Sequence, residues 1–99
     1  MSDDSEIVHH PIPGRFATEV DGHLAHLDYE MDGEVMHITH TVVPEPIGGR
    51  GVASRLVRAA VEHARNEGFT IKPVCSYAED WFGKHPDAAD VLAAGAEER

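Results

Sequence analysis

The sequence predicts a mixed α/β domain: an antiparallel meander of three strands, then a helix, a parallel strand and short C-terminal helices. Two Asp-Gly pairs, at 21–22 and 32–33, separate segments in which apolar and polar residues alternate. Such pairs favour two-residue turns between antiparallel strands, because glycine adopts a positive φ without steric cost. From residue 51 the apolar spacing becomes helical, and another apolar segment follows at 69–76. A strand, a helix and a strand in succession imply a right-handed crossover and a parallel pair.

The meander is predicted to comprise strands at 15–20, 23–31 and 34–43. Alternation along the second strand places two sets of side chains on opposite faces: Ala25, Leu27, Tyr29 and Met31 on one, and Leu24, His26, Asp28 and Glu30 on the other. The third strand is expected to direct one set of side chains to a single face, namely Met36, Ile38, His40 and Val42. Residues 7–13 are expected to add a short edge strand, which their prolines weaken.

The central helix is predicted to begin at Gly51, because Pro44 and Pro46 end the preceding strand. Its buried stripe is expected to contain Val52, Leu56, Ala60 and Ala64, flanked by Ala53, Val57 and Val61. The side chains expected to point outward are Ser54, Arg55, Arg58, Glu62 and Arg65. Gly68 is suited to ending the helix. The tail, 77–95, is predicted to form a short helix, a break at the His-Pro pair 85–86 and one or two further helical turns.

Composition narrows the class of protein. The chain has 99 residues, the size of one domain (1–99, with 1–5 expected to be disordered), and a formal net charge of −10. That charge argues against a nucleic-acid partner. We expect a cytoplasmic protein without a membrane partner, because the chain shows no signal peptide or membrane-length apolar run, and its lone Cys75 allows no internal disulfide. We expect no metal site either, since His37 and His40, three apart in a strand, should face opposite sides.

The glycine-rich segment before the helix is the strongest functional signal. Gly48, Gly49 and Gly51 permit a tight turn, and the first N–H groups of a helix have no partner within it. Together with the helix dipole, these groups form an anion site for which diphosphate is a natural ligand. A stretch free of carboxylates, 46–61, also contains three arginines: Arg50, Arg55 and Arg58. An ordinary solvated helix face is the alternative explanation for those charges.

The motif excludes two classes of phosphate-binding loop. GGRGVA lacks the Gly-Lys-Ser/Thr of a P-loop and the spaced glycines of a dinucleotide-binding fingerprint. It resembles the acyl-CoA diphosphate motif of GNAT N-acetyltransferases, Gln/Arg-x-x-Gly-x-Gly/Ala, whose last two positions Gly51 and Ala53 match. Gly48 replaces the usual Gln or Arg, which removes one side-chain contact. Over residues 35–92, and most specifically in PVCSY and KHP, the chain is similar to the small single-domain GNAT-like family.

The resemblance implies a truncated GNAT-like fold that holds acetyl-CoA, as co-substrate, between the third and fourth strands. It implies that the diphosphate lies on the segment made of Gly48, Gly49, Arg50, Gly51, Val52, Ala53 and Ser54, with Arg55 adding charge. The pantetheine would pair with the backbone near Val42 and Val43. The two helices that longer GNAT enzymes insert after their first strand have no room here, so the acceptor site is expected to be open.

Three side chains are candidates for catalysis. His40, just before the pantetheine segment, titrates near neutrality, whereas a histidine on a packed or solvated strand face is the alternative. Cys75, at the carboxyl end of the fourth strand, is a candidate nucleophile or pocket residue, and an inert buried thiol is the alternative. Tyr77 is a candidate acid for the CoA thiolate by the same resemblance, although it follows its strand earlier than is usual. Trp81 and Phe82 are expected to pack the tail helix onto the sheet.

We therefore hypothesise an N-acetyltransferase that transfers acetyl from acetyl-CoA to an amine by direct attack in a ternary complex. The acidic hairpin residues favour a cationic acceptor such as a lysine side chain, a basic peptide or a polyamine: Glu19, Asp28, Glu30 and Glu34. Two alternatives stay open, a non-catalytic acyl-CoA-binding or regulatory module and an interaction domain without a ligand.

Overall fold

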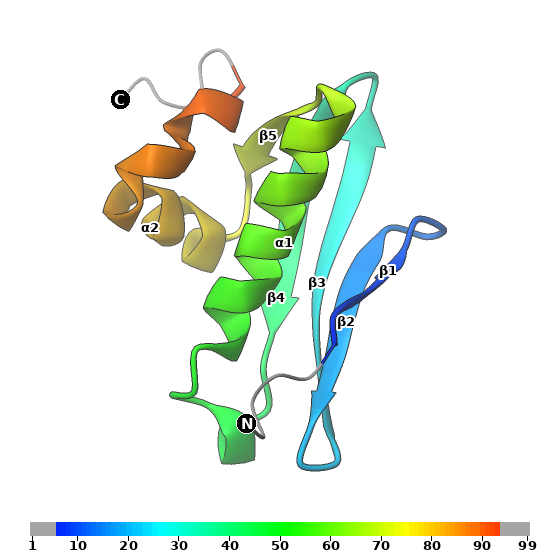
Figure 1. Ribbon diagram of the computed structural model, residues 1–99, viewed down its shortest axis with the longest axis vertical. Helices are drawn as coiled ribbons and strands as arrows, with labels where there is room; N and C mark the ends of the chain where they lie inside the picture. The colour runs from blue at the N-terminus through cyan, green and yellow to red at the C-terminus, as the bar shows by residue number, and fades with distance from the viewer. Residues whose placement is uncertain (1–5, 94–99) are drawn as a thin grey trace.

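A single five-stranded sheet with the order β1-β2-β3-β4-β5 forms the centre of the computed structural model, which describes residues 6–93. Its strands are Val8–His10, Arg15–Val20, His23–Asp32, Val35–Val42 and Thr70–Pro73. The first four strands pair antiparallel, and β5 pairs parallel with β4. Helix α1 (Val52–Glu67) connects these last two strands and lies across one face of the sheet (Figure 1). The predicted mixed α/β fold is therefore confirmed, and residues 1–5 lie outside the described part.

Both predicted hairpins form, but the second turn lies one residue later than predicted, at Gly33 and Glu34, because Asp32 still pairs with Val35. Val20 pairs with His23 across the first turn, in which Asp21 has φ 52° and Gly22 has φ 80°. Gly33, with φ 63°, stands in the second turn. Positive φ at both central residues gives the first turn the twist that antiparallel strands require. The predicted short edge strand before the first hairpin is also present, as β1.

The central helix begins one residue later than predicted. Gly51, with φ 78°, is the N-cap of α1, and Gly68, with φ 79°, is its C-cap. The amide of Phe69 donates to the carbonyl of Ala64 at 2.8 Å, which satisfies one of the last helical carbonyls. The buried stripe matches the prediction except at Ala53, which is half-buried; it comprises Val52, Leu56, Val57, Ala60, Val61 and Ala64.

The C-terminal part packs beside α1. Helix α2 (Ser76–Lys84) ends at His85, and the 3-10 helix η2 (Pro86–Val91) follows the predicted His-Pro break. Trp81 and Phe82 are buried, with 3% and 6% of their surface exposed, as expected for core residues. The prediction that Ser54 and Arg55 point into solvent is wrong, because both residues are half-buried. Trp81 of α2 contacts the hydroxyl of Ser54.

A β-bulge in β4 corrects the predicted faces of this strand. Asp28 pairs with His40 and Tyr29 pairs with Ile38, so Thr39 is an extra residue between the two pairs. The bulge shifts the alternation of β4 by one position. Beyond it, His40 and Val42 share a face with Asp28 and His26, opposite to the core face of Met36 and Ile38. His37 pairs with Glu30, so His37 and His40 lie on the same face, contrary to the sequence-based expectation.

The core lies between α1 and the sheet. Its largest fully buried side chains come from the strands, α1 and the 3-10 helix η1 (Glu45–Ile47): Leu27, Met36, Ile38, Ile47, Leu56 and Ile71. Burial of each such side chain stabilises the folded state by about 1.5–3 kcal/mol relative to leaving it exposed. This packing fixes the glycine turn, which connects η1 to α1, against the end of β4.

Candidate functional site

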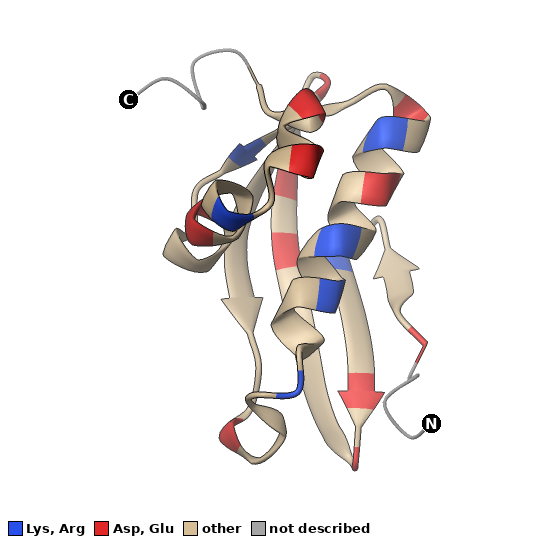
Figure 2. Cartoon of the chain, turned by 60° about the vertical axis from the view of Figure 1, so that its left-hand side comes forward, with Lys and Arg blue, Asp and Glu red and all other residues tan. Residues whose placement is uncertain are grey.

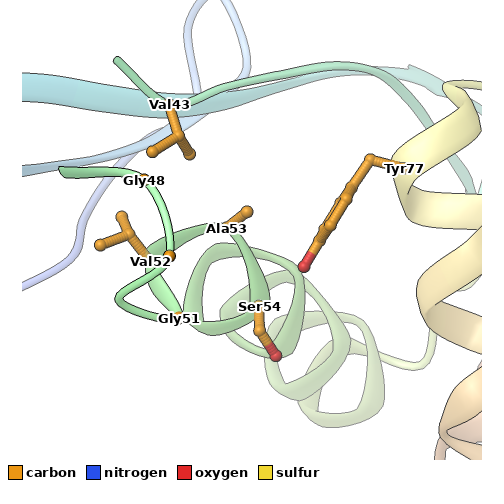
Figure 3. A pocket seen from close by; sticks show the side chains of 8 residues that line it. Val43, Gly48, Gly51, Val52, Ala53, Ser54 and Tyr77 are labelled. Carbon is orange, nitrogen blue, oxygen red and sulfur yellow. The ribbon is translucent and has the colours of Figure 1, made fainter. Parts of the chain in front are cut away.

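A pocket of about 250 Å³ opens where the glycine turn enters α1. Figure 3 shows the phenol of Tyr77 projecting from α2 toward the first turn of α1, with Val43 across the pocket. The lining residues come from the end of β4, the glycine turn, α1 and α2: Val43, Gly48, Gly49, Gly51, Val52, Ala53, Ser54 and Tyr77. Seven of the ten predicted cofactor-binding residues thus line one pocket, whereas Val42, Arg50 and Arg55 lie outside its lining.

The backbone of this pocket suits an anion. Within residues 6–93, the amides of Val52, Ala53 and Ser54 have no backbone or side-chain acceptor, as is usual in the first turn of a helix. A Cβ added to Gly49 or Gly51 would meet no heavy atom within 4 Å. The turn is therefore open where a diphosphate would approach, and the positive end of the α1 dipole adds an attractive field.

The predicted arginines are largely engaged by other side chains. In Figure 2 basic residues line α1 and the turn before it, while acidic residues follow β3. Arg50 donates to Asp21 at 2.6 Å, at the tip of the first hairpin. Arg58 lies 5.2 Å from the centre of the Trp81 ring and 3.6 Å from an oxygen of Asp87. An anion bound at this turn would consequently depend on backbone N–H groups more than on these guanidinium groups.

The two parallel strands separate beside the pocket. Their pairing ends at Ile38 and Pro73, while β4 continues to Val42. The amides of Val74 and Cys75 both donate to the carbonyl of Ile38 at 3.0 Å, which turns the chain away from β4. Among the described strands, none pairs with residues 39–42 on the β5 side. Their backbone edge can therefore pair with an extended amide-containing ligand, as an added strand would.

Of the three catalytic candidates, only Tyr77 lines the pocket. Its side chain is 40% exposed. Partial burial raises the pKa of Tyr77, which the charge of Lys84 partly opposes and the charge of Asp80 reinforces. The phenol therefore keeps its proton at neutral pH and can donate it to a leaving thiolate.

The other two candidates lie outside the pocket lining. His40 is exposed on the face of the sheet opposite α1, and its Nδ1 lies 3.2 Å from the hydroxyl of Thr39. Cys75 is half-buried at the start of α2, where its Sγ accepts from the amide of Ala78 at 3.3 Å. The thiol thus caps α2, a role in which serine is usually found.

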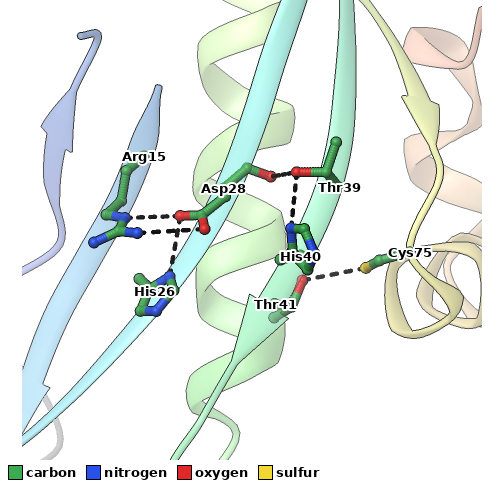
Figure 4. A network of polar contacts seen from close by, with 7 residues as sticks. All are labelled: Arg15, His26, Asp28, Thr39, His40, Thr41 and Cys75. Carbon is green, nitrogen blue, oxygen red and sulfur yellow. Dashed lines mark hydrogen bonds and ion pairs between the residues drawn. The ribbon is translucent and has the colours of Figure 1, made fainter. Parts of the chain in front are cut away.

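The face of the sheet opposite α1 carries a polar network that includes one predicted acceptor-binding residue. Figure 4 shows Arg15 and His26 converging on Asp28, at 2.7 and 3.0 Å from its Oδ1. Partial burial alone would raise the pKa of Asp28, but hydrogen bonds from Arg15 and His26 outweigh it, so the pKa lies below its ordinary value. Asp28 is therefore ionised and already paired, which reduces its capacity to attract a cationic acceptor.

Between residues 6 and 93 no group of three or more His, Cys, Asp or Glu side chains could hold a metal ion. None of the helices in this range has the length and apolar content needed to cross a membrane.

Comparisons with known proteins agree with this geometry. A family model described as GCN5-related N-acetyl-transferase matches residues 15–91. A solution NMR structure of a GCN5-like candidate N-acetyltransferase from Staphylococcus aureus is 30% identical and has a TM-score of 0.73. The match covers 98% of this chain and 99% of that one. The fold and these two matches define an acyltransferase, here with a mixed sheet and a glycine turn at a helix N-terminus. The chain belongs to the GCN5-related N-acetyltransferase (GNAT) family.

Sequence reasoning missed two contacts at the site. The indole N–H of Trp81 donates to the hydroxyl of Ser54 at 2.8 Å, and the hydroxyl of Thr41 lies 3.4 Å from the sulfur of Cys75. Each joins residues far apart in the chain, so neither leaves a local pattern. The helical pattern placed Ser54 on the outward side of the helix, so it gave no signal of this partner.

Proposed function

We propose that this acyltransferase uses acetyl-CoA and transfers the acetyl group to an amine by direct attack in a ternary complex. The observation that carries the proposal is the coincidence of three features in one pocket: first-turn amides without protein acceptors, an open glycine turn and the phenol of Tyr77. The family membership supports acetyl transfer in general.

Each part of the pocket has a proposed role. The amides of Val52, Ala53 and Ser54 bind the diphosphate, and the free edge of β4 at 39–43 pairs with the pantetheine amides. Acetyl-CoA supplies an acetyl group activated as a thioester. The C–N bond to the amine forms as the C–S bond breaks, and the thiolate takes a proton from the Oη of Tyr77. The amine releases its own proton to solvent or to His40, which lies on the accessible face of β4.

The proposed acceptor is cationic. Glu19 and Glu30 are exposed, and Glu34 precedes β4, so these carboxylates can attract a lysine side chain, a basic peptide or a polyamine. Asp28 is removed from the predicted set, because Arg15 and His26 neutralise it. Equal turnover of matched neutral and cationic amines would contradict this part of the proposal.

A second candidate is a non-catalytic acyl-CoA-binding or regulatory module. The observation that favours it is the composition of the pocket, since none of its lining residues is a carboxylate or an imidazole that could take a proton from the acceptor. An interaction domain without a ligand, the third class, does not account for the open turn beside Tyr77.

One experiment separates these functions. Acetyl-CoA is titrated into the isotope-labelled protein, and we expect amide shifts concentrated at residues 48–54. The same protein is then mixed with acetyl-CoA and a panel of amines, and thiol release is followed. Shifts with release support the acetyltransferase, and shifts without release across the panel support the binding module. The absence of shifts at 48–54 would exclude both.

A further inference from the structure

The indole of Trp81 is held in one place by three neighbours. It is 3% exposed, and its ring stacks on that of His85 with centres 4.0 Å apart and planes 11° apart. The guanidinium of Arg58 lies over the ring, 5.2 Å from its centre. From this fixed ring the N–H donates to the Oγ of Ser54, 27 positions earlier in the chain, at 2.8 Å.

The chemistry of this contact fixes the role of each atom. An indole N–H can only donate, whereas a serine hydroxyl has one proton to donate and lone pairs that accept. Ser54 must therefore accept from Trp81, and its own proton is left for another acceptor. Without the indole, a serine near the start of a helix can rotate and donate back to a carbonyl of the preceding turn.

The position of Ser54 gives that proton a destination. Ser54 lies in the first turn of α1 and lines the pocket, next to the amides that have no protein acceptor (Figure 3). We propose that Trp81 is a positioning residue for the diphosphate of CoA: by donating to Ser54, it directs the Ser54 hydroxyl proton toward the bound anion. This inference rests on the proposed acetyl-CoA site.

The same contact sets the distance between the two walls of the pocket. Tyr77 and Trp81 are four residues apart on α2 and therefore lie on one side of that helix. The bond from Trp81 to Ser54 consequently ties the α2 wall, which carries Tyr77, to the α1 wall. It thus positions one diphosphate donor and holds the phenol near the acetyl end.

The test compares the binding of two probes: CoA, which carries a diphosphate, and pantetheine, which does not. Trp81→Phe keeps an aromatic ring between Arg58 and His85 and removes the N–H. We expect this variant to bind CoA at least about tenfold more weakly, the effect of one hydrogen bond to a charged group, and to bind pantetheine, which has no diphosphate, as wild type does. Ser54→Ala should show the same selective loss. The double variant should lose no more than either single variant, because both remove one coupled interaction.

A matched control separates positioning from packing. His85→Ala removes the ring that stacks on Trp81 but leaves the N–H, so it should lower the unfolding temperature without changing the ratio of CoA to pantetheine affinity. Equal losses for both probes in Trp81→Phe, or unchanged CoA affinity in Ser54→Ala, would overturn the inference. Should Trp81→Phe fail to fold, Ser54→Ala alone decides. Failure of the wild-type protein to bind CoA would instead remove the proposed function itself.

Discussion

The hydroxyl of Thr41 lies 3.4 Å from the sulfur of Cys75, and this contact joins β4 to the start of α2 beyond the last paired residues of the two parallel strands. The bulge at Thr39 makes it possible, because it turns Thr41 to the face of Leu27, with which it pairs, instead of the opposite face. Cys75 also caps α2. The thiol is therefore a structural group at the point where the strands separate.

Because the Cys75 thiol caps α2, two substitutions of this residue should differ in their effect on stability. Cys75→Ala should destabilise the protein by about 1 kcal/mol, because the amide of Ala78 loses its acceptor. Cys75→Ser keeps an acceptor and should retain both stability and acetyl transfer, since direct attack needs no thiol. Urea unfolding and a turnover assay measure these effects. An acetylated Cys75 found by mass spectrometry, together with an inactive Cys75→Ser variant, would contradict direct attack.

Glycines at the two ends of α1 provide a matched pair for the anion site. Gly51 and Gly68 have nearly the same φ, 78° and 79°, and each has open space around its Cβ position. Substitution of either by Glu should cost about 1 kcal/mol of stability from the left-handed backbone. Only Gly51→Glu places a carboxylate beside the diphosphate, and we expect it to weaken CoA binding by at least about tenfold. Calorimetric titration of both variants checks this, and equal affinities would remove the site from this turn.

Tyr77→Phe should lower the rate of acetyl transfer about 100-fold, the usual size of a lost general acid, with CoA affinity unchanged. The pKa of Tyr77 is raised, mainly by burial. The wild-type rate should therefore fall only at strongly alkaline pH, when the phenol loses its proton, and the variant should lack this fall. Tyr29→Phe is the control, because the pKa of Tyr29 is also raised by burial but the residue lies outside the pocket. A comparable rate loss in Tyr29→Phe would point to a folding defect instead.

Stability should decrease in mild acid because of His9. Its ring stacks on Phe16 at 4.2 Å, meets His63 edge-on at 4.4 Å and contacts the Tyr29 hydroxyl. Partial burial, followed by the charges of His63 and His10, lowers the pKa of His9 from 6.5. The unfolded chain then binds the proton more tightly than the folded protein does. The stabilisation that the neutral His9 ring provides is fully present above pH 6.5. It is lost as the pH falls below 6.5 and through the lower pKa that His9 has in the folded protein.

The variant His9→Phe keeps the ring stack and cannot be protonated. Denaturant unfolding at several pH values above and below 6.5 should show a smaller loss of stability in acid for this variant than for wild type. An identical pH dependence for the two proteins would show that His9 does not contribute to acid sensitivity.

Removal of the Asp21 charge, which pairs with Arg50, should increase the affinity for CoA. Asp21→Asn keeps a residue that tolerates φ 52° and removes a negative charge beside the glycine turn. CoA affinity should rise about two- to threefold at low salt and less at high salt, because exposed charges are screened. Asp32→Asn, at the end of β3 beside the other hairpin turn, is the control and should leave the affinity unchanged. A similar gain in both variants would mean that only the overall charge matters.

The meander and the glycine turn before α1 could be predicted because their signals are local. Asp21-Gly22 and Gly33 specify turns through backbone freedom alone, and Gly51 and Gly68 mark the two ends of α1 in the same way. The bulge at Thr39 could not be predicted, since no glycine or proline marks it and threonine fits any strand position.

The side chains of the site were harder to predict than its backbone. Arg50 is predicted to bind the ligand, and no local pattern indicates that its guanidinium also donates to Asp21, 29 residues away. Ser54 was expected in solvent, yet it is half-buried and contacts Trp81 of α2. Such contacts depend on which elements pack together, and this information lies in the complete fold and not in any window of sequence.

The order of the sheet follows the order of the chain, with one consequence for how the site is completed. The pairings of β1 to β4 close over short connections, whereas β5 reaches β4 only after a loop that includes the whole of α1, and longer closures cost more entropy. The gap proposed to receive the ligand lies just beyond this last pairing. We therefore expect intermediates on the way to the native state to contain a hairpin sheet without any ability to recognise the nucleotide.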